Sequence, residues 1–327
     1  MEVVAYTGAV VIGRNEGELL RQCLLSVVGK LDQVVYADSG STDGSIELAH
    51  KMGATVVALD PSSPFTAARG RNEGFTRLME LAPDTKYVQF IDGDCEVMAG
   101  WLEAGVKFLQ SHAQHAVVCG RLRERYPEAS IYNRLCDIEW NGAVGDIDAC
   151  GGIFMIRANT FTEIGVMNST ISAGEEPEMC LRLRRQGWLI ARIDKEMGWH
   201  DANMTSFSQW WKRAMRSGHS YAQGYALHGK EKEKYCLRPS LRIWGWAFVL
   251  PLLIILVTII WAPRYSSLFW GIYFLQFIKI ALGIRRKIPE TQHALLYSLF
   301  NLLGKFPEMI GQIQYLTSFD QRTKFKL

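Results

Sequence analysis

Two carboxylates one residue apart are the clearest candidates for chemistry in this chain. Residues 87–91 form a short apolar run, and Asp92, Gly93 and Asp94 follow it directly. Such a run predicts a buried strand, so the two acids would lie where that strand leaves its sheet. Close carboxylates repel each other unless a cation lies beside them, and Mg²⁺ is bound by one or two carboxylates together with phosphates and water. A solvated Asp-Gly turn is the alternative for the triplet alone.

A second acidic pair, Glu175 and Glu176, precedes a predicted helix over residues 177–186. Proline suits the first turn of a helix, and Gly187 fits the position just past its end. The pair would then lie at the helix N-terminus, where the macrodipole favours an anion by about 0.3–1 kcal/mol. An ionised carboxylate there can act as a base that takes the proton from an attacking hydroxyl. An ordinary acidic first turn is the alternative.

Strands and helices that alternate along the first half of the chain would position these acids. Apolar spacing predicts helices between the strands, most clearly over Ala67–Leu81 and over residues 99–110. The alternation predicts an α/β fold with a doubly wound, mostly parallel sheet and helices on both faces. The predicted strands cover residues 9–12, 33–37, 55–59, 87–91 and 116–120.

Polar clusters follow four of the predicted strands, at residues 14–16, 38–43, 60 and 92–94. Open α/β sheets bind ligands along the edge formed by the carboxyl ends of their strands. The sequence has neither the dinucleotide fingerprint Gly-x-Gly-x-x-Gly nor the phosphate-binding Gly-x-x-x-x-Gly-Lys-Ser/Thr. A nucleotide at this edge would therefore be bound by other means.

Composition narrows the class of protein. The 327 residues carry a net charge of only +3, which is no sign of nucleic-acid binding. The seven cysteines include no Cys-x-x-Cys pair, so free thiols in a reducing cytosol are expected rather than a zinc or redox site. No charged leader followed by an apolar core opens the chain, and no signal peptide is expected.

The C-terminal third of the chain is apolar enough to meet a membrane. Residues 241–261 and Ser267–Ile284 are long apolar runs that predict a transmembrane hairpin. Basic residues gather before the first run and after the second, while the loop between them has only Arg264, which predicts that both ends face the cytoplasm. Residues 295–316 are interrupted by charges and proline, which predicts an interfacial amphipathic helix; a third span is the alternative.

Four parts are therefore expected along the chain. They are a cytoplasmic catalytic domain over residues 1–228, a charged linker over 229–240, the hairpin over 241–284, and the interfacial helix with a basic tail over 285–327.

Several segments, in order and spacing, resemble the family 2 inverting glycosyltransferases of GT-A fold. The likeness covers roughly residues 8–220, and the order of the segments makes it more specific than any one of them. It is carried by residues 10–17 (VVIGRNEG), 38–45 (DSGSTDGS), 68–74 (ARGRNEG), Asp92-Gly-Asp94, Gly151-Gly152, residues 174–182 (GEEPEMCLR), Gly187-Trp188 and His200.

The resemblance implies a role for each matched residue. Glu16 and Asp38 would contact the nucleoside of a nucleotide sugar, and Arg71 its base or diphosphate. Asp92 and Asp94 would bind ribose, sugar and a metal ion, Mg²⁺ or Mn²⁺, with His200 completing the metal or diphosphate site. The implied donor-binding residues are Arg14, Glu16, Asp38, Ser39, Arg71, Asp92 and Arg213, and the implied metal ligands are Asp94, Asp92 and His200.

Two departures from the family pattern matter. The family usually has Glu-Asp with the second acid as catalytic base, so the resemblance makes Glu176 the base and leaves Glu175 as the alternative. The Gln-x-x-Arg-Trp motif of polymer-forming members is not matched around Arg213, which weakens a polymer synthase. Arg213 and Arg216 share a predicted helix face and could meet a diphosphate of either the donor or a lipid acceptor.

The expected function is therefore an inverting, metal-dependent glycosyltransferase that moves one sugar from a nucleotide sugar, with UDP the expected nucleotide. The resemblance implies a membrane-associated, polyprenyl-diphosphate-linked saccharide as acceptor, in bacterial polysaccharide assembly at the cytoplasmic face of the inner (plasma) membrane. A homo-oligomer stays open. The alternatives are a processive polysaccharide synthase and a non-catalytic, membrane-tethered scaffold that binds nucleotide sugars.

Overall fold

The computed structural model describes residues 4–260, 263–285 and 287–317. These residues form two compact units, each described by itself below. The first unit runs to Tyr126 and continues over Glu139–Ala202, and the second comprises Pro127–Ile138 and the residues from Asn203 onward. Helix α8 (Phe207–His228), which the sequence assigns to the catalytic domain, belongs to the second unit.

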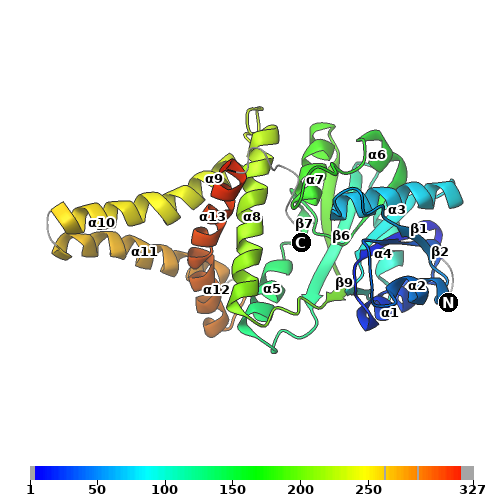
Figure 1. Cartoon of the computed structure of the whole chain (residues 1–327), viewed down its shortest axis with the longest axis horizontal. Coiled ribbons are helices and arrows are strands. Elements are labelled where there is room, and N and C mark those ends of the chain that lie inside the picture. The colour runs from blue at the N-terminus through cyan, green and yellow to red at the C-terminus, as the bar shows by residue number, and fades with distance from the viewer. Residues whose placement is uncertain (1–3, 261–262, 286, 318–327) are drawn as a thin grey trace. The chain divides into compact units, whose positions relative to one another are not determined.

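A nine-stranded sheet forms the centre of the first unit, in the order β3-β2-β1-β4-β8-β6-β9-β5, with β7 paired to β9 (Figure 1). All five predicted strands are present, as β1, β2, β3, β4 and β6, and β1 and β6 are longer than predicted. The strands are β1 (Val4–Gly13), β2 (Leu31–Asp38), β3 (Thr55–Ala58), β4 (Tyr87–Asp92), β5 (Cys95–Val97), β6 (His115–Glu124), β7 (Gly145–Asp146), β8 (Phe154–Arg157) and β9 (Leu189–His200).

The direction of the strands changes beyond β4. Strands β3, β2, β1 and β4 are parallel, as predicted. Strand β8 is antiparallel to both β4 and β6, and β5 and β7 are antiparallel to β9. Strands β6 and β9 are again parallel to each other, so the sheet is mixed rather than mostly parallel, with β8 as the antiparallel strand between β4 and β6.

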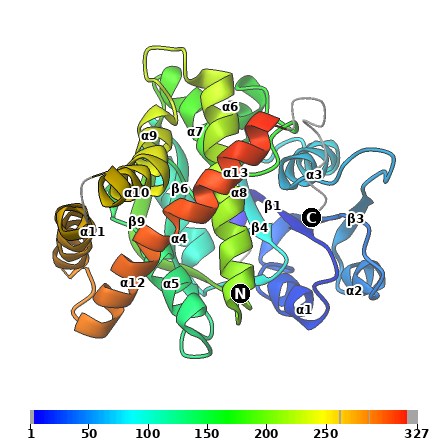
Figure 2. The same cartoon turned by 60° about the vertical axis from the view of Figure 1, so that its left-hand side comes forward.

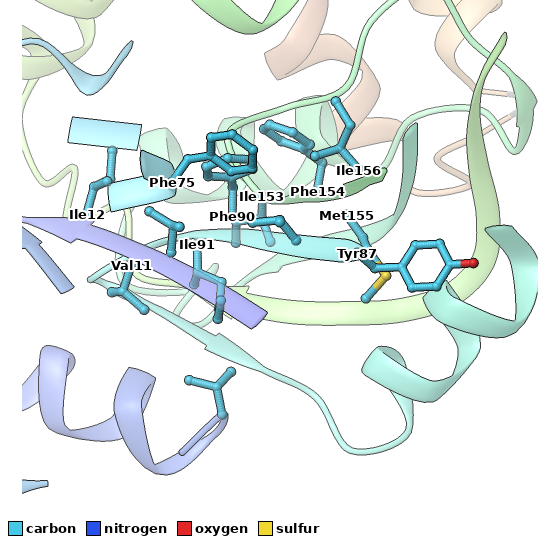
Figure 3. Close-up of a cluster of buried hydrophobic side chains, with 14 of the residues drawn as sticks. Val11, Ile12, Phe75, Tyr87, Phe90, Ile91, Ile153, Phe154, Met155 and Ile156 are labelled. Atoms are coloured by element: carbon cyan, nitrogen blue, oxygen red, sulfur yellow. The ribbon is translucent and has the colours of Figure 1, made fainter. Parts of the chain in front are cut away.

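Aromatic side chains fill the core around β4 (Figure 3). The rings of Phe90 and Phe154, on paired strands, have centroids 5.1 Å apart, and Phe75 meets Phe161 edge-on at 4.8 Å. Because helices cover both faces, β1 and β4 read as nearly continuous apolar runs. Strand β4 is consequently a rigid support for the acids at its end.

Two helices of the first unit, α3 and α7, begin close to where the sequence predicts. Thr66 caps α3 by accepting a hydrogen bond from the Arg69 amide at 3.1 Å, so α3 has the predicted bounds. Helix α7 begins at Glu175, which places the acidic pair in its first turn as predicted. The helices are α1 (Glu18–Leu25), α2 (Ser45–Lys51), α3 (Ala67–Leu81), α4 (Trp101–Ser111), α6 (Ala158–Glu163) and α7 (Glu175–Arg185).

The second unit is helical in the described residues. Helix α5 (Ile131–Trp140) starts in it and ends in the first unit. A capping box of Ser206 and Gln209 starts α8. The remaining helices are α9 (Leu237–Trp244), the π-helix η1 (Gly245–Val249), α10 (Leu250–Ile260), α11 (Pro263–Ile284), α12 (Thr291–Leu303) and α13 (Lys305–Thr317).

Two helices of the second unit are long and apolar enough to cross a membrane. The helix over Leu237–Ile260 is 24 residues long and reaches a mean hydropathy of 2.6 within an 18-residue window, and Ser267–Ile284 has 1.6 over its 18 residues. The first helix starts inside the predicted linker, since α9, η1 and α10 are continuous. The predicted end of that span, Trp261, lies outside the described residues. Length and composition thus suit a membrane anchor of two helices.

The single helix predicted over residues 295–316 is wrong. Two helices, α12 and α13, occupy this region and are interrupted at Gly304. Pro307, which has no amide donor, lies in the first turn of α13, where that donor would have no partner. Helix α13 packs against α8, and a Cβ added to Gly218 or Gly311 would overlap the facing backbone (Figure 2).

Candidate active site

The strand register brings the predicted clusters to one edge of the sheet. Gly13 at the end of β1 pairs with Asp38 at the end of β2, and Ile12 pairs with Asp92 at the end of β4. Because these strands are parallel, the loops that follow them leave the sheet on the same side. The predicted convergence of the first, second and fourth clusters is confirmed.

Hydrogen bonds join the loops after β1 and β2. The Asn15 amide donates to Ser41 Oγ at 2.9 Å, and Asn15 Oδ1 accepts from the Thr42 amide at 2.7 Å. The Gly17 amide donates to Asp43 Oδ2 at 3.1 Å. Asn15 has φ of 58°, a left-handed conformation that asparagine tolerates. The two loops therefore form one organised segment of the edge.

Asp38 and Ser39 lie within this segment. Asp38 is fully buried, and its Oδ1 accepts from the Tyr36 hydroxyl at 2.9 Å. Its Oδ2 accepts from the amides of Gly40 and Ser41 at 2.9 and 2.8 Å, while the Ser39 amide donates to Gly13 O at 3.0 Å. The Asp38 carboxylate thus shapes the loop that carries Ser39, and contact of either residue with a nucleoside remains a prediction.

Glu16 lies close to the acids that follow β4. A Cβ on Gly93 would lie 3.1 Å from Glu16 Cγ, and Glu16 Oε1 accepts from the Arg14 amide at 3.3 Å. Burial, followed by the charge of Asp94, raises the pKa of Glu16. The Arg14 guanidinium lies 5.7 Å from the centroid of the Phe65 ring, a cation–π distance.

Arg71 joins three carboxylates from distant parts of the chain. Its Nη1 lies 2.9 Å from Glu175 Oε1 and 3.0 Å from Glu176 Oε1. Its Nη2 lies 2.8 Å from Asp92 Oδ1 and 3.3 Å from Gly152 O. The Arg71 side chain is only 2% exposed. We refer to Arg71, Asp92, Glu175 and Glu176 as the Arg71 cluster; contact of Arg71 with the base or diphosphate of a donor stays a prediction.

The crowding of acids in the Arg71 cluster changes their ionisation. Burial raises the pKa of Glu176 to about 7, helped by the charge of Glu175 and opposed by Arg71. Burial also raises the pKa of Asp92, which Arg71 counteracts and Asp94 reinforces. A carboxyl group that exchanges its proton near pH 7 suits a general base.

Gly152 makes room for the Arg71 cluster. A Cβ at this position would lie 2.6 Å from Asp92 Oδ2, 3.1 Å from Arg71 Nη2 and 3.4 Å from Glu176 Oε1. No real Cβ fits at the first of these distances without a shift, so the absence of a side chain keeps the space beside Asp92 open. The glycine pair noted in the sequence therefore has a steric reason at its second member.

Asp94 and His200 form a second group. Asp94 Oδ2 lies 3.1 Å from His200 Nε2, because β5 pairs with β9 so that Cys95 faces His200. The Trp140 indole stacks on His200, with ring centroids 4.4 Å apart and planes 10° apart. We refer to Asp94 and His200 as the Asp94–His200 pair. The sequence analysis missed Trp140, since nothing in its local pattern connects it with a histidine 60 residues later.

The hydrogen bond within this pair decides its ionisation. Burial acts to raise the pKa of Asp94, but the bond to His200 and the imidazole charge outweigh burial and leave that pKa below its ordinary value. For His200, burial acts to lower the pKa, and Asp94 more than compensates, so this pKa is raised. Asp94 is thus a carboxylate at neutral pH.

The donor atoms here fit a divalent cation. Ligand atoms of Asp94, Cys95 and His200 lie within 4.8 Å of one another. Burial raises the pKa of the Cys95 thiol well above its ordinary value, and Sγ lies 3.3 Å from Asp94 Oδ1, so Cys95 stays a protonated neighbour. Carboxylate and imidazole together suit a transition ion such as Mn²⁺, whereas Mg²⁺ prefers oxygen alone.

Arg213 is the one predicted site residue in the second unit, on α8. Burial and the charge of Arg213 lower the pKa of Arg216, which agrees with the predicted shared helix face. The role of Arg213 in binding a diphosphate remains a prediction.

Parts of this chain are similar in sequence to known proteins. Residues 9–161 match the model of glycosyl transferase family 2. A TPR repeat-containing protein of Synechococcus elongatus is 30% identical over 134 residues, which cover 40% of this chain and 31% of that protein. The glycosyltransferase AglE of Haloferax volcanii is 22% identical over 228 residues, which cover 65% of this chain and 72% of that protein.

The fold has a relative among solved structures. A mannosyltransferase from Pyrobaculum calidifontis, solved in complex with GDP-Man and Mn²⁺, matches with a TM-score of 0.59 at 14% identity, covering 96% of this chain and 88% of that one. At this identity the likeness shows the fold, which is GT-A-like as expected. Residues 9–161 are thus similar to glycosyl transferase family 2, and the similarity to a glycosyltransferase extends over about two thirds of the chain.

Proposed function

We propose that this protein is an inverting glycosyltransferase that transfers one sugar from a nucleotide sugar to an acceptor at a membrane. The observation that carries the proposal is the contact of Arg71 with both Glu176 and Asp92 in the Arg71 cluster. This contact places the Glu176 carboxyl group, whose pKa is about 7, beside Asp92 at the edge of the sheet where ligands bind in such folds. A base next to donor-binding acids is the arrangement that a single displacement needs.

Glu176 acts as the base in this proposal. It accepts the proton of the acceptor hydroxyl while the hydroxyl oxygen forms a bond to the anomeric carbon. The bond from that carbon to the diphosphate oxygen breaks on the opposite face, and the nucleotide diphosphate leaves with the electron pair. One displacement inverts the configuration of the sugar. Glu175, on the same arm of Arg71, is the alternative base.

Residues at the edge of the sheet would bind the donor. Arg14, Glu16, Asp38 and Ser39 would contact the nucleoside, and Asp92 would contact ribose and sugar. A divalent cation held by Asp94 and His200, when bound, would neutralise the charge that develops on the diphosphate. The mannosyltransferase of similar fold binds GDP-Man and Mn²⁺, so guanine as well as uracil nucleotides belong in a test, and Mn²⁺ is the first cation to use.

The acceptor would be a lipid-linked saccharide, with a polyprenyl diphosphate as the expected carrier. The two long apolar helices support a place at a membrane, and Arg213 and Arg216 on α8 could meet a lipid diphosphate. Basic residues outside the hairpin support a catalytic domain on the cytoplasmic face of a bacterial inner membrane. A cysteine introduced at Ser266, in a background without native cysteines, should react with an impermeant maleimide from the outer side; reaction only after permeabilisation would reverse this topology.

A screen of nucleotide sugars with membrane lipid extract and Mn²⁺ tests the function, with release of nucleotide diphosphate as the readout. We expect release that depends on one nucleotide sugar and on the extract. Binding of a nucleotide sugar with no release would favour the non-catalytic scaffold. A lipid product extended by many sugars would favour the processive synthase, whereas one added sugar supports our proposal.

A further inference from the structure

Both arms of the Arg71 guanidinium contact groups of the protein itself. Each Nη atom has two oxygen neighbours, and the Arg71 side chain is 2% exposed. The N–H on Nε is buried and has no hydrogen-bond partner among the described residues. Three N–H donors make hydrogen bonds, to Glu175, Asp92 and Gly152 O, and Glu176 forms an ion pair with the same guanidinium. Because both arms are occupied and the side chain is enclosed, a phosphate or a base could reach this group only by displacing a carboxylate.

We propose that Arg71 is a positioning residue that sets the distance between Glu176 and Asp92, rather than a contact to the donor. This inference rests on the proposed function. Glu176 and Glu175 lie on Nη1, and Asp92 lies on Nη2 of the same rigid fork. The base and the donor-binding acid therefore keep a fixed separation, and the acceptor hydroxyl meets the sugar in a defined geometry.

The helix that carries Arg71 is itself held tightly against the sheet. A Cβ on Gly74 would lie 2.5 Å from Val10 Cγ1, and a Cβ on Gly70 would lie 3.3 Å from Ile12 Cγ2. Glycines on both sides of Arg71 thus bring α3 into close contact with β1. Asp92 is on β4, which pairs with β1. The Arg71 guanidinium and the Asp92 carboxylate are therefore both held by elements that pack directly on β1.

The charges in the Arg71 cluster also support a positioning role for Arg71. Three carboxyl groups lie within 3.0 Å of a single cation, and each would repel the others without it. A lysine would retain the charge, but as a single point it cannot span both arms of the fork. The geometry of the guanidinium, and not its charge alone, is therefore what the cluster requires.

The variant Arg71→Lys tests the inference. We expect kcat to fall by about 100-fold, the usual effect of a displacement near 1 Å at a reacting centre, while the Kd of the donor changes by less than about threefold. The donor Kd is measured by calorimetry with Mn²⁺, and kcat by nucleotide release. The control is Arg69→Lys, two residues earlier on α3, where Arg69 pairs with Glu73 at 2.6 Å outside the cluster; neither constant should change.

A different result would overturn the inference. If Arg71→Lys weakens donor binding more than about tenfold and leaves kcat unchanged, Arg71 contacts the donor. If thermal melting shows that Arg71→Lys does not fold, Arg71→Gln combined with Glu175→Gln removes one charge of each sign, and the same fall in kcat with an unchanged Kd is expected. If the parent protein neither binds a nucleotide sugar nor releases nucleotide, the proposed function fails, and this inference fails with it.

Discussion

Asp92 and Asp94 are two residues apart, yet their pKa values shift in opposite directions. Asp92 belongs to the Arg71 cluster, and Asp94 belongs to the Asp94–His200 pair. In the Arg71 cluster three acids share one cation, and burial raises the pKa values of Asp92 and Glu176. In the pair one acid has one partner, and the hydrogen bond to His200 lowers the pKa of Asp94. Burial acts to raise the pKa of all three acids, and only at Asp94 does the partner outweigh burial.

This difference assigns separate tasks to the two groups. An acid that stays ionised is ready to bind a cation, whereas an acid that titrates near neutrality can accept a proton and later release it. Changes confined to one group should therefore alter one task and leave the other.

Asp94→Asn should have the largest effect. Loss of the carboxylate removes the charge that pairs with His200 and with a cation, and a bound metal contributes several kcal/mol to such reactions, so transfer should fall by at least about 10³-fold. Calorimetry should show that Mn²⁺ no longer increases donor affinity. The control is Asp60→Asn, an exposed acid after β3 that bonds Ser62. Equal donor affinity of the parent in excess EDTA and in Mn²⁺ would contradict the metal role.

Glu176→Gln should lower kcat by about 10²–10⁴-fold, the usual contribution of a general base, and leave the donor Kd nearly unchanged. Glutamine keeps the shape and accepts from Arg71 but cannot take a proton. Glu176→Asp should retain partial activity. If Glu175→Gln abolishes turnover and Glu176→Gln does not, Glu175 is the base; if neither variant slows turnover, the base lies elsewhere.

The pH dependence should identify the same group. Because the pKa of Glu176 is about 7, kcat should fall about tenfold per pH unit below that value as the base becomes protonated. The residual activity of Glu176→Gln should lack this acid limb. The free energy of unfolding should depend on pH in the opposite direction. Because the raised pKa favours the protonated carboxyl group in the folded state, Glu176 stabilises the fold at low pH, and this stabilisation is lost as the pH rises through about 7. Thermal melting of the parent and of Glu176→Gln between pH 5 and 8 measures it.

Trp140→Ala should have the smallest effect. The stack on His200 resembles aromatic pairs worth about 0.5–1.5 kcal/mol, so Mn²⁺ affinity should fall about 2–12-fold. Trp140→Phe keeps a ring and should recover most of the affinity. Titration of Mn²⁺ by electron paramagnetic resonance measures the change. An unchanged affinity in Trp140→Ala would mean that the stack does not orient His200.

The sequence predicts the parts of this site that depend on local pattern. The apolar runs that became β1, β2 and β4 and the limits of α3 follow from periodicity and capping chemistry, and the helix predicted over residues 177–186 became α7, which begins two residues earlier at Glu175. Parallel pairing of those strands then places their polar ends together. A short list of candidate residues was within reach because strand ends and helix starts are local features.

Features that depend on contacts between distant segments could not be predicted. Nothing near Arg71 in the sequence shows that its side chain is enclosed by Gly152 and Glu175, which lie 81 and 104 residues later, since burial of a long side chain is a tertiary property. The same holds for Trp140 on His200. The break at Gly304, in contrast, had a local signal, because Pro307, three residues later, suits the first turn of a new helix.

The position of β5 has a consequence for how the protein is made. Strand β5 follows β4 after two residues, but its partner in the sheet is β9, which is completed only at His200. Contacts of such long sequence separation form late, because the loop that joins them must close first. The emerging chain therefore holds Asp94 without its histidine until more than a hundred further residues have been synthesised. A nascent chain that stops before β9 already has the loops after β1, β2 and β4, so cation binding should mark the completion of folding of the first unit.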